Sequence, residues 1–227
     1  MPGAAVLEFQ LDEVVVGITD YLLALECTLF AWMLQAGSGW RQVRLLFAAF
    51  FGVTALASLA GGTSHIFFAQ STSLPADVLW KATVLSLGAT AFAAWGIGAS
   101  LLFKKPTQGW IIKLAAAEFL VYAIYVASID DRFIVAITNY IPAACFLALC
   151  FAVRYWQSRR APILFGLAGL GVTAIAAQAQ RARFALHPLY FNHNATYHAV
   201  QAIGLFLIFI AAVFFVRKGG EHESTGP

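Results

Sequence analysis

Long apolar stretches recur along the whole chain, separated by short polar or charged segments. An apolar helix of roughly 20 residues can cross the ~30 Å hydrocarbon core of a bilayer. The pattern therefore predicts an all-α, polytopic membrane protein, with seven transmembrane helices in a single bundle over residues 1–218. The expected spans are 13–36, 43–69, 79–103, 109–129, 133–153, 162–184 and 195–217. The polar, Gly-rich residues 219–227 are expected to form a disordered cytoplasmic tail.

Composition supports a membrane protein. Of the 227 residues, 61% are hydrophobic and 11% are charged, which is too apolar for a soluble domain with one core. Ten of the fourteen Lys and Arg residues fall at one set of helix ends, namely Arg41, Arg44, Lys104, Lys105, Lys113, Arg154, Arg159, Arg160, Arg217 and Lys218. The positive-inside rule then places the N-terminus outside and the C-terminus in the cytoplasm. The net charge of +3 comes from these anchors, so we expect no nucleic-acid partner, and the short loops suit a bacterial inner membrane.

Polar side chains gather at the opposite, outer helix ends. Polar and ionisable groups are costly at membrane depth, and their convergence from six helices predicts a site open to the outer side. The candidates are Asp20, Ser58, Ser64, His65, Asp77, Asn139, Gln178, Gln180, His193, Asn194, His198 and Gln201. Individually, a buried His can be a packing residue, Asn194 can be a helix cap, and Asp20 can bind a ligand or a neighbouring helix.

Helical spacing groups these candidates into faces. Ser58 and His65 are seven residues apart and share a face with Gly61. Asn194, His198 and Gln201 form a second stripe at i, i+4 and i+7. His193 lies five residues before His198, about 140° away on an ideal helix. It can join the same site only if the chain at 193 is not yet helical.

The cluster suggests metal chemistry. A catalytic zinc ion needs three protein ligands and one open position for water. His65, His193 and His198 are the candidate ligands, Asp77 is the candidate proton acceptor, and Ser58 or Ser64 is a candidate donor to a developing oxyanion. Asp20, Asn194 and Gln201 are expected to contact a bound ligand. At the membrane boundary such a site would hydrolyse a lipid amide or ester.

Taken together, these features resemble the superfamily of alkaline ceramidases and progestin/adiponectin-type receptors. The shared features are seven helices, Ser and His late on the second, Asp at the start of the third and a His pair at the start of the seventh. The resemblance implies a zinc ion held by three histidines and hydrolysis of a sphingolipid-like amide. His65 and His198 would then be ligands and Asp77 the acid near the metal-bound water. The chain departs from the family pattern at Gly61, where the family has Ser, and at Asn194, where it has His.

Other functions compete with the zinc hydrolase. A retinal protein needs a Lys in the middle of the seventh helix, and none precedes Lys218 there. A haem carrier could use His65 and His198 as axial ligands. The main alternative is a non-enzymatic protein, either a receptor for a small ligand or lipid or an accessory subunit of a membrane complex. It would use Asp20, His65, Asn194, His198 and Gln201 for hydrogen bonding without a metal.

Overall fold

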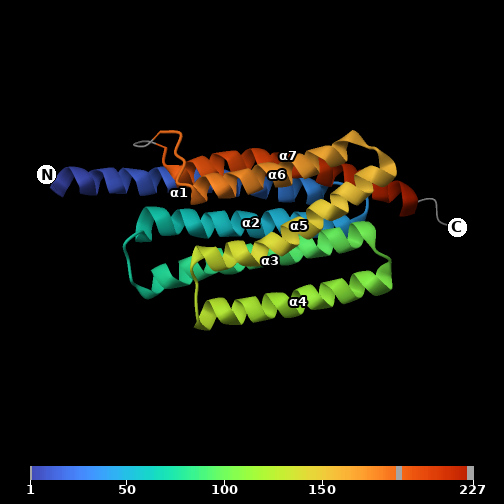
Figure 1. Ribbon diagram of the computed structural model, residues 1–227, viewed down its shortest axis with the longest axis horizontal. Coiled ribbons are helices and arrows are strands. Elements are labelled where there is room, and N and C mark those ends of the chain that lie inside the picture. Colours follow the sequence, from blue (N-terminus) through green and yellow to red (C-terminus); the bar gives the residue numbers. More distant parts are fainter. Residues whose placement is uncertain (1, 188–190, 224–227) are drawn as a thin grey trace.

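The computed structural model describes residues 2–187 and 191–223, and seven α-helices account for most of them. The helices are α1 (Pro2–Ala36), α2 (Arg41–Phe68), α3 (Leu74–Leu102), α4 (Lys105–Ser128), α5 (Phe133–Ser158), α6 (Ala161–Arg181) and α7 (His193–Glu223). Each contains a span long and apolar enough to cross a membrane, which confirms the predicted all-α fold and indicates an integral membrane protein. The N-terminus and the C-terminus lie at opposite ends of the bundle (Figure 1).

Helix ends differ from the expected spans where polar residues continue the helix. α1 starts at Pro2, well before residue 13, and α5 continues to Ser158. α7 runs to Glu223, past residue 218 where the predicted bundle ends, while 224–227 lie outside the described residues. The backbone hydrogen bonds of a helix do not require apolar side chains, so hydropathy marks the membrane crossing and not the helix end.

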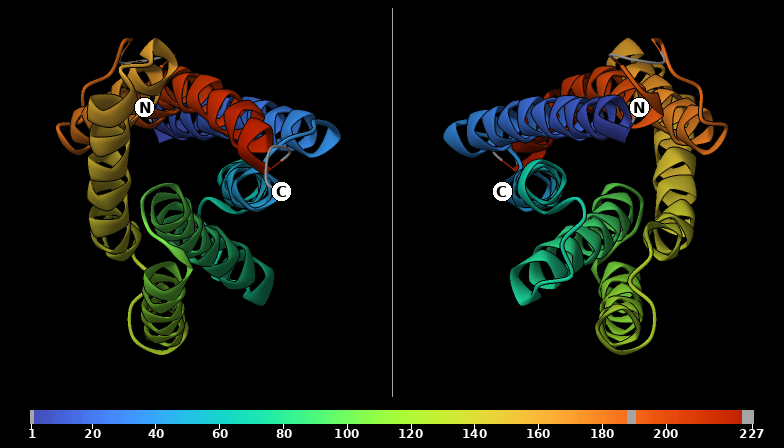
Figure 2. Two further views of the ribbon diagram at one scale, coloured as in Figure 1. Left: turned by 90° about the vertical axis from the view of Figure 1, so that its right-hand side faces the viewer. Right: turned by 90° about the vertical axis from the view of Figure 1, so that its left-hand side faces the viewer.

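Six helices form a closed ring. Packing runs from α1 to α2, α3, α5, α6 and α7 and returns to α1, with a smaller contact between α2 and α7 inside it. The end-on views show this arrangement, with α4 at the periphery beyond α3 (Figure 2). Within the described part of the chain, α3 is the only helix against which α4 packs extensively. The seven-helix bundle is therefore a six-helix ring with one helix attached outside it.

Two glycine pairs allow the ring helices to approach closely. A Cβ atom at Gly62 would lie 2.9 Å from the carbonyl oxygen of Gly17, where α1 meets α2. A Cβ at Gly169 would lie 2.5 Å from the carbonyl oxygen of Gly204, where α6 meets α7. Small residues are the usual means of bringing transmembrane helices together, because lipid supplies no hydrophobic driving force between them.

Phenylalanines fill the middle of the ring. Phe30 of α1 stacks on Phe209 of α7 with ring centroids 4.3 Å apart. Phe51 of α2 meets Phe30 edge-on at 5.3 Å, and all three side chains are buried. Polar side chains of the ring interior lie toward the end of the bundle that carries the N-terminus, here called the N-terminal end. The phenylalanine cluster lies between these polar side chains and the opposite, C-terminal end of the bundle.

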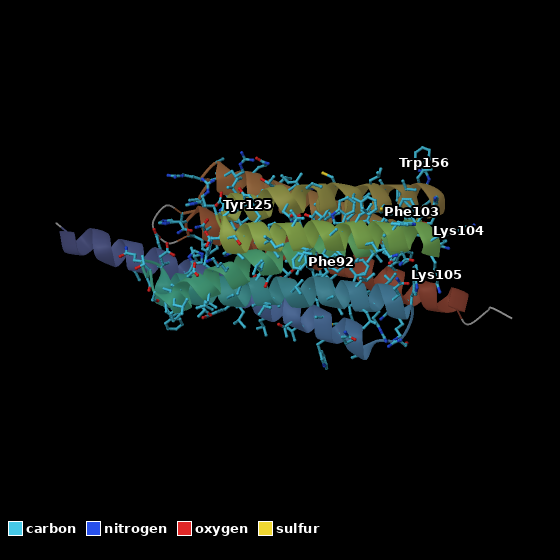
Figure 3. All side chains as sticks on the ribbon, turned by 90° about the horizontal axis from the view of Figure 1, so that it is seen from below. Phe92, Phe103, Lys104, Lys105, Tyr125 and Trp156 are labelled. Atoms are coloured by element: carbon cyan, nitrogen blue, oxygen red, sulfur yellow. The ribbon has the colours of Figure 1, made fainter. Side chains whose placement is uncertain are left out.

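The opposite, C-terminal end of the bundle carries basic and aromatic anchors. Lys104, Lys105, Phe103 and Trp156 lie at this end, away from Tyr125 (Figure 3). The side chain of Arg159 lies over the Trp156 ring, 4.3 Å from its centroid. Amphipathic aromatic rings beside basic groups are typical of a membrane–water interface.

Candidate functional site

A cavity of about 160 Å³ lies inside the ring, in its N-terminal half. All six ring helices contribute to its wall and α4 does not. Its lining residues are Asp20, Thr54, Ala57, Ser58, Gly61, His65, Trp80, Thr83, Leu87, Phe133, Gln180, Asn194, Tyr197, His198 and Gln201. Six of the nine predicted site residues are among them: Asp20, Ser58, His65, Asn194, His198 and Gln201. The histidines of α2 and α7 thus share one cavity.

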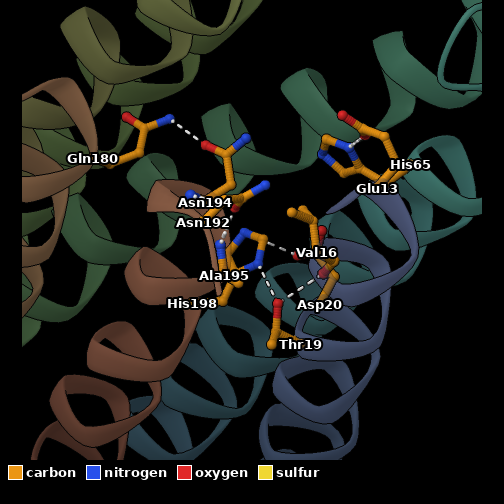
Figure 4. Close-up of polar contacts among 10 residues, drawn as sticks. All are labelled: Glu13, Val16, Thr19, Asp20, His65, Gln180, Asn192, Asn194, Ala195 and His198. Carbon is orange, nitrogen blue, oxygen red and sulfur yellow. Dashed lines mark hydrogen bonds and ion pairs between the residues drawn. The ribbon is translucent and has the colours of Figure 1, made fainter. Parts of the chain in front are cut away.

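The most buried part of the site pairs α7 with α1. His198 Nδ1 lies 3.0 Å from the Thr19 hydroxyl, and His198 Nε2 lies 3.3 Å from Asp20 Oδ1 (Figure 4). The Thr19 hydroxyl donates to the carbonyl oxygen of Val16 at 2.7 Å. Its proton is therefore used, and Thr19 accepts a hydrogen bond from Nδ1–H. Nε2 then faces the carboxyl group of Asp20.

His65 is held by a second carboxylate of α1. Its Nδ1 lies 2.6 Å from Glu13 Oε2, within the range of a short charge-assisted hydrogen bond (Figure 4). Glu13 and Asp20 are seven residues apart and so lie close in direction on α1. One helix face therefore supplies a carboxylate to each of the two histidines, a connection that the sequence pattern of α2 and α7 does not reveal.

Amide side chains complete the wall near the start of α7. Gln180 donates its Nε2–H to Asn194 Oδ1 at 3.1 Å, which ties α6 to α7. Gln201 lies within hydrogen-bonding reach of the Tyr197 hydroxyl. Asn194 is therefore a wall residue, and the helix cap is Asn192, whose Oδ1 accepts from the backbone N–H groups of Asn194 and Ala195.

Two predicted catalytic residues lie outside this cavity. Ser64 and Asp77 line a separate surface depression at the N-terminal end, which shares only His65 and Trp80 with the cavity. Asp77 Oδ2 accepts from Lys81 Nζ at 2.9 Å, one helical turn along α3. Asp77, the predicted proton acceptor, is thus engaged in a partly exposed ion pair with Lys81. His65 and Trp80 stand between the depression and the cavity.

The predicted ligand set is not assembled. α7 is already helical at His193, so this side chain is turned about 140° from His198, and it does not line the cavity. Over the described ranges, no three His, Cys, Asp or Glu side chains lie close enough together to hold a metal ion. The donor set of the cavity therefore does not fit a three-ligand zinc centre as it stands.

Sequence reasoning missed several contributors to the site. Three of them lie near predicted residues along the chain: Thr19 precedes Asp20, Tyr197 precedes His198, and Glu13 lies two helical turns before Asp20. Hydroxyl and carboxyl side chains at such positions are too common in sequences to indicate a site. Phe133 and Thr83 carry no sequence signal for a site. The indole N–H of Trp80 donates to the carbonyl oxygen of Asp131 at 2.9 Å, and Trp80 also lines the cavity.

Comparison with known proteins identifies a family without assigning a function. Residues 15–215 match the model of DUF6962, a family of unknown function, so the chain belongs to that family. No curated protein and no solved structure matches the chain.

Proposed function

We propose that this member of the DUF6962 family is a seven-helix receptor-type membrane protein that binds a small organic amine in the ring cavity, reached from the outer face of a bacterial inner membrane. The observation that carries the proposal is the convergence of polar side chains from five helices on one cavity inside otherwise apolar spans. Burial of so many polar groups is costly in a membrane, and a ligand that pairs with them offsets that cost.

Cavity size limits the ligand. A volume of about 160 Å³ is close to the ~150 Å³ cavity that holds one benzene molecule. A whole lipid or a retinal needs far more space. The cavity therefore favours a single ring or a short branched chain, with a polar group at one end.

Charge further limits the ligand to a cation or a neutral molecule. The lining contains Asp20 and two histidines but no Lys or Arg. Asp20 Oδ2 lies in the cavity wall beside Gly61, where a Cβ atom on that glycine would be 3.4 Å from this oxygen. An ammonium group fits there, and the rings of Trp80, Phe133 and Tyr197 provide faces for a cation and an apolar body. An anion would meet a buried carboxylate and no fixed positive charge.

Benzylamine, benzyl alcohol and benzoate test this proposal, because they share a ring and differ in charge. We expect benzylamine to bind purified protein in lipid nanodiscs and to raise its unfolding temperature, with benzyl alcohol weaker and benzoate without effect. Asp20→Asn should weaken benzylamine binding at least tenfold, which corresponds to about 1.4 kcal/mol. Glu26→Gln is the matched control, because Glu26 is also on α1 but does not line the cavity. Equal binding of benzoate and benzylamine, or of Asp20→Asn and wild type, would contradict the proposal.

A zinc-dependent hydrolase of a lipid amide or ester is the second candidate. One observation favours it: Nδ1 of His65 and Nδ1 of His198 are each held by a hydrogen-bonding partner, which is how metal-binding histidines are commonly oriented. The hydrolase requires about one zinc ion per chain after purification without chelators, and loss of that zinc in His65→Ala and His198→Ala. Zinc-free protein that still binds benzylamine supports the receptor and excludes this candidate.

A further inference from the structure

A second recess lies outside the ring, on the lipid-facing side of the bundle. Because α4 is attached to α3 and not to α5, the two helices leave a groove of about 800 Å³ between them, with Trp95 of α3 among its lining residues. This volume lies within the range of roughly 300–1,000 Å³ typical of small-molecule sites. The groove shares no lining residue with the ring cavity, so it is a separate site.

Each wall of the groove carries a polar atom without a partner. Glu118 Oε2 on α4 and Asn139 Nδ2 on α5 are both inaccessible to solvent and make no hydrogen bond to any described residue. An unpaired polar group in an apolar environment costs several kcal/mol, since the hydrocarbon core offers no water to satisfy it. An acceptor on one wall and a donor on the other call for a ligand that can satisfy both.

Pro142 adds a third polar group to the same groove. Proline has no backbone N–H, so the carbonyl oxygen of Thr138, four residues earlier, lacks its usual helical donor. The Thr138 hydroxyl does not replace that donor, because it donates instead to the carbonyl oxygen of Ile134 at 2.8 Å. Thr138 and Pro142 both line the groove.

Depth and size decide between the possible occupants. Glu118 lies ten residues before the end of α4 at Ser128, or about 15 Å into the membrane at 1.5 Å per residue. A phospholipid presents only methylene groups at that depth. A transmembrane helix about 30 Å long and 10–12 Å wide needs several times the volume of the groove.

Charge at the rim of the groove gives no reason to favour a phosphate headgroup. Arg132 donates to Asp130 through Nε and Nη2, and these hydrogen bonds hold the pKa of the Asp130 carboxyl below its usual range. The Asp130 carboxylate therefore already compensates the positive charge of Arg132. The unsatisfied groups of Glu118 and Asn139 lie deeper in the same groove.

We infer that the groove between α4 and α5 binds the ring of a lipid-soluble quinol or quinone. Such a ring is flat, carries oxygen atoms on opposite sides, and partitions into the bilayer on an apolar chain. Asn139 donates to one ring oxygen, and Glu118 and the Thr138 carbonyl accept from a quinol hydroxyl on the other side. The aromatic side chains of Trp95 and Tyr125 line the groove at two different levels and provide apolar surface for the ring and its chain. Binding alone is inferred, and no electron transfer is assigned to the protein.

Fluorescence quenching by decylubiquinone and decylubiquinol tests the inference on full-length protein in nanodiscs. We expect saturable quenching with one site per chain, and we expect Trp95→Phe to remove most of it, although five other Trp residues remain. Glu118→Leu and Asn139→Leu should each weaken binding at least tenfold. Glu26→Gln should bind normally, because Glu26 also has an unpartnered Oε2 but lies on α1, away from the groove.

Two outcomes would overturn the inference without depending on any variant. Linear, non-saturable quenching of the wild-type protein would show only partitioning of the quinone into lipid. Equal displacement of bound decylubiquinone by dodecane, which has no oxygen atoms, would show a purely apolar groove. Stable co-purification of another membrane protein, lost in Glu118→Leu, would assign the groove to a partner helix instead.

Discussion

Thr19 and His198 are 179 positions apart in the chain, yet the Thr19 hydroxyl lies 3.0 Å from His198 Nδ1. This contact joins the first and the last helix of the ring and sets the orientation of the imidazole. The hydroxyl is committed as a donor to Val16, so it can serve His198 only as an acceptor. The Nε2 atom is thereby directed toward Asp20 and the cavity.

Thr19→Val therefore removes the acceptor and keeps the shape of the side chain. We expect benzylamine to bind up to about tenfold more weakly, since an intramolecular hydrogen bond contributes about 0.5–1.5 kcal/mol. Thr19→Ser retains the hydroxyl and should bind nearly as well as wild type. Titration calorimetry on the two variants makes the comparison. Equal loss in both would mean that packing of the Thr19 methyl group matters and the hydrogen bond does not.

Substitutions at Gly61 test whether benzylamine binds in the part of the ring cavity beside Asp20. A Cβ atom at this position meets only ordinary contacts at 3.4–3.8 Å, so Gly61→Ala should fold and bind normally. Gly61→Leu extends into the cavity and should abolish benzylamine binding while the unfolding temperature stays close to that of wild type. Unimpaired binding in Gly61→Leu would place the ligand elsewhere.

The crossing of α6 and α7 predicts a difference between two glycines on one helix. A Cβ at Gly169 would meet the backbone oxygen of Gly204 at 2.5 Å, whereas a Cβ at Gly171 meets nothing within 4 Å. Gly169→Ala should therefore destabilise the protein by about 1–3 kcal/mol, as overpacking does. Gly171→Ala should be neutral or slightly stabilising, because alanine favours the helix. Thermal unfolding in detergent, followed by circular dichroism, measures both.

Membrane orientation is tested with single cysteines. The free thiols Cys27, Cys145 and Cys150 are first replaced by alanine or serine. With the N-terminus outside, a membrane-impermeant maleimide should label Ser71→Cys in intact cells. Lys104→Cys, in the connection between α3 and α4, should react only after permeabilisation. The reverse labelling pattern would invert the topology and place the ring cavity on the cytoplasmic side.

Sequence patterns predicted the spans and much of the cavity for identifiable reasons. A span must be long and apolar, so hydropathy locates all seven, and buried groups such as Asp20 and His198 stand out against that background. Hydropathy does not show which helices pack against each other, because surfaces facing lipid and surfaces facing other helices are both apolar. The position of α4 outside the ring could not be read from its composition. His193 lies outside the cavity lining, because one residue of helix phase decides where a side chain points.

Closure of the ring by α1 and α7 also bears on how the protein is made. The wall around Asp20 is completed only when α7 packs against α1, so a chain that stops before α7 leaves this carboxyl group without His198. Premature termination anywhere upstream of residue 193 thus yields a product with an exposed polar seam. Such products are suited to recognition by membrane quality-control proteases, and the seam disappears once α7 has packed against α1.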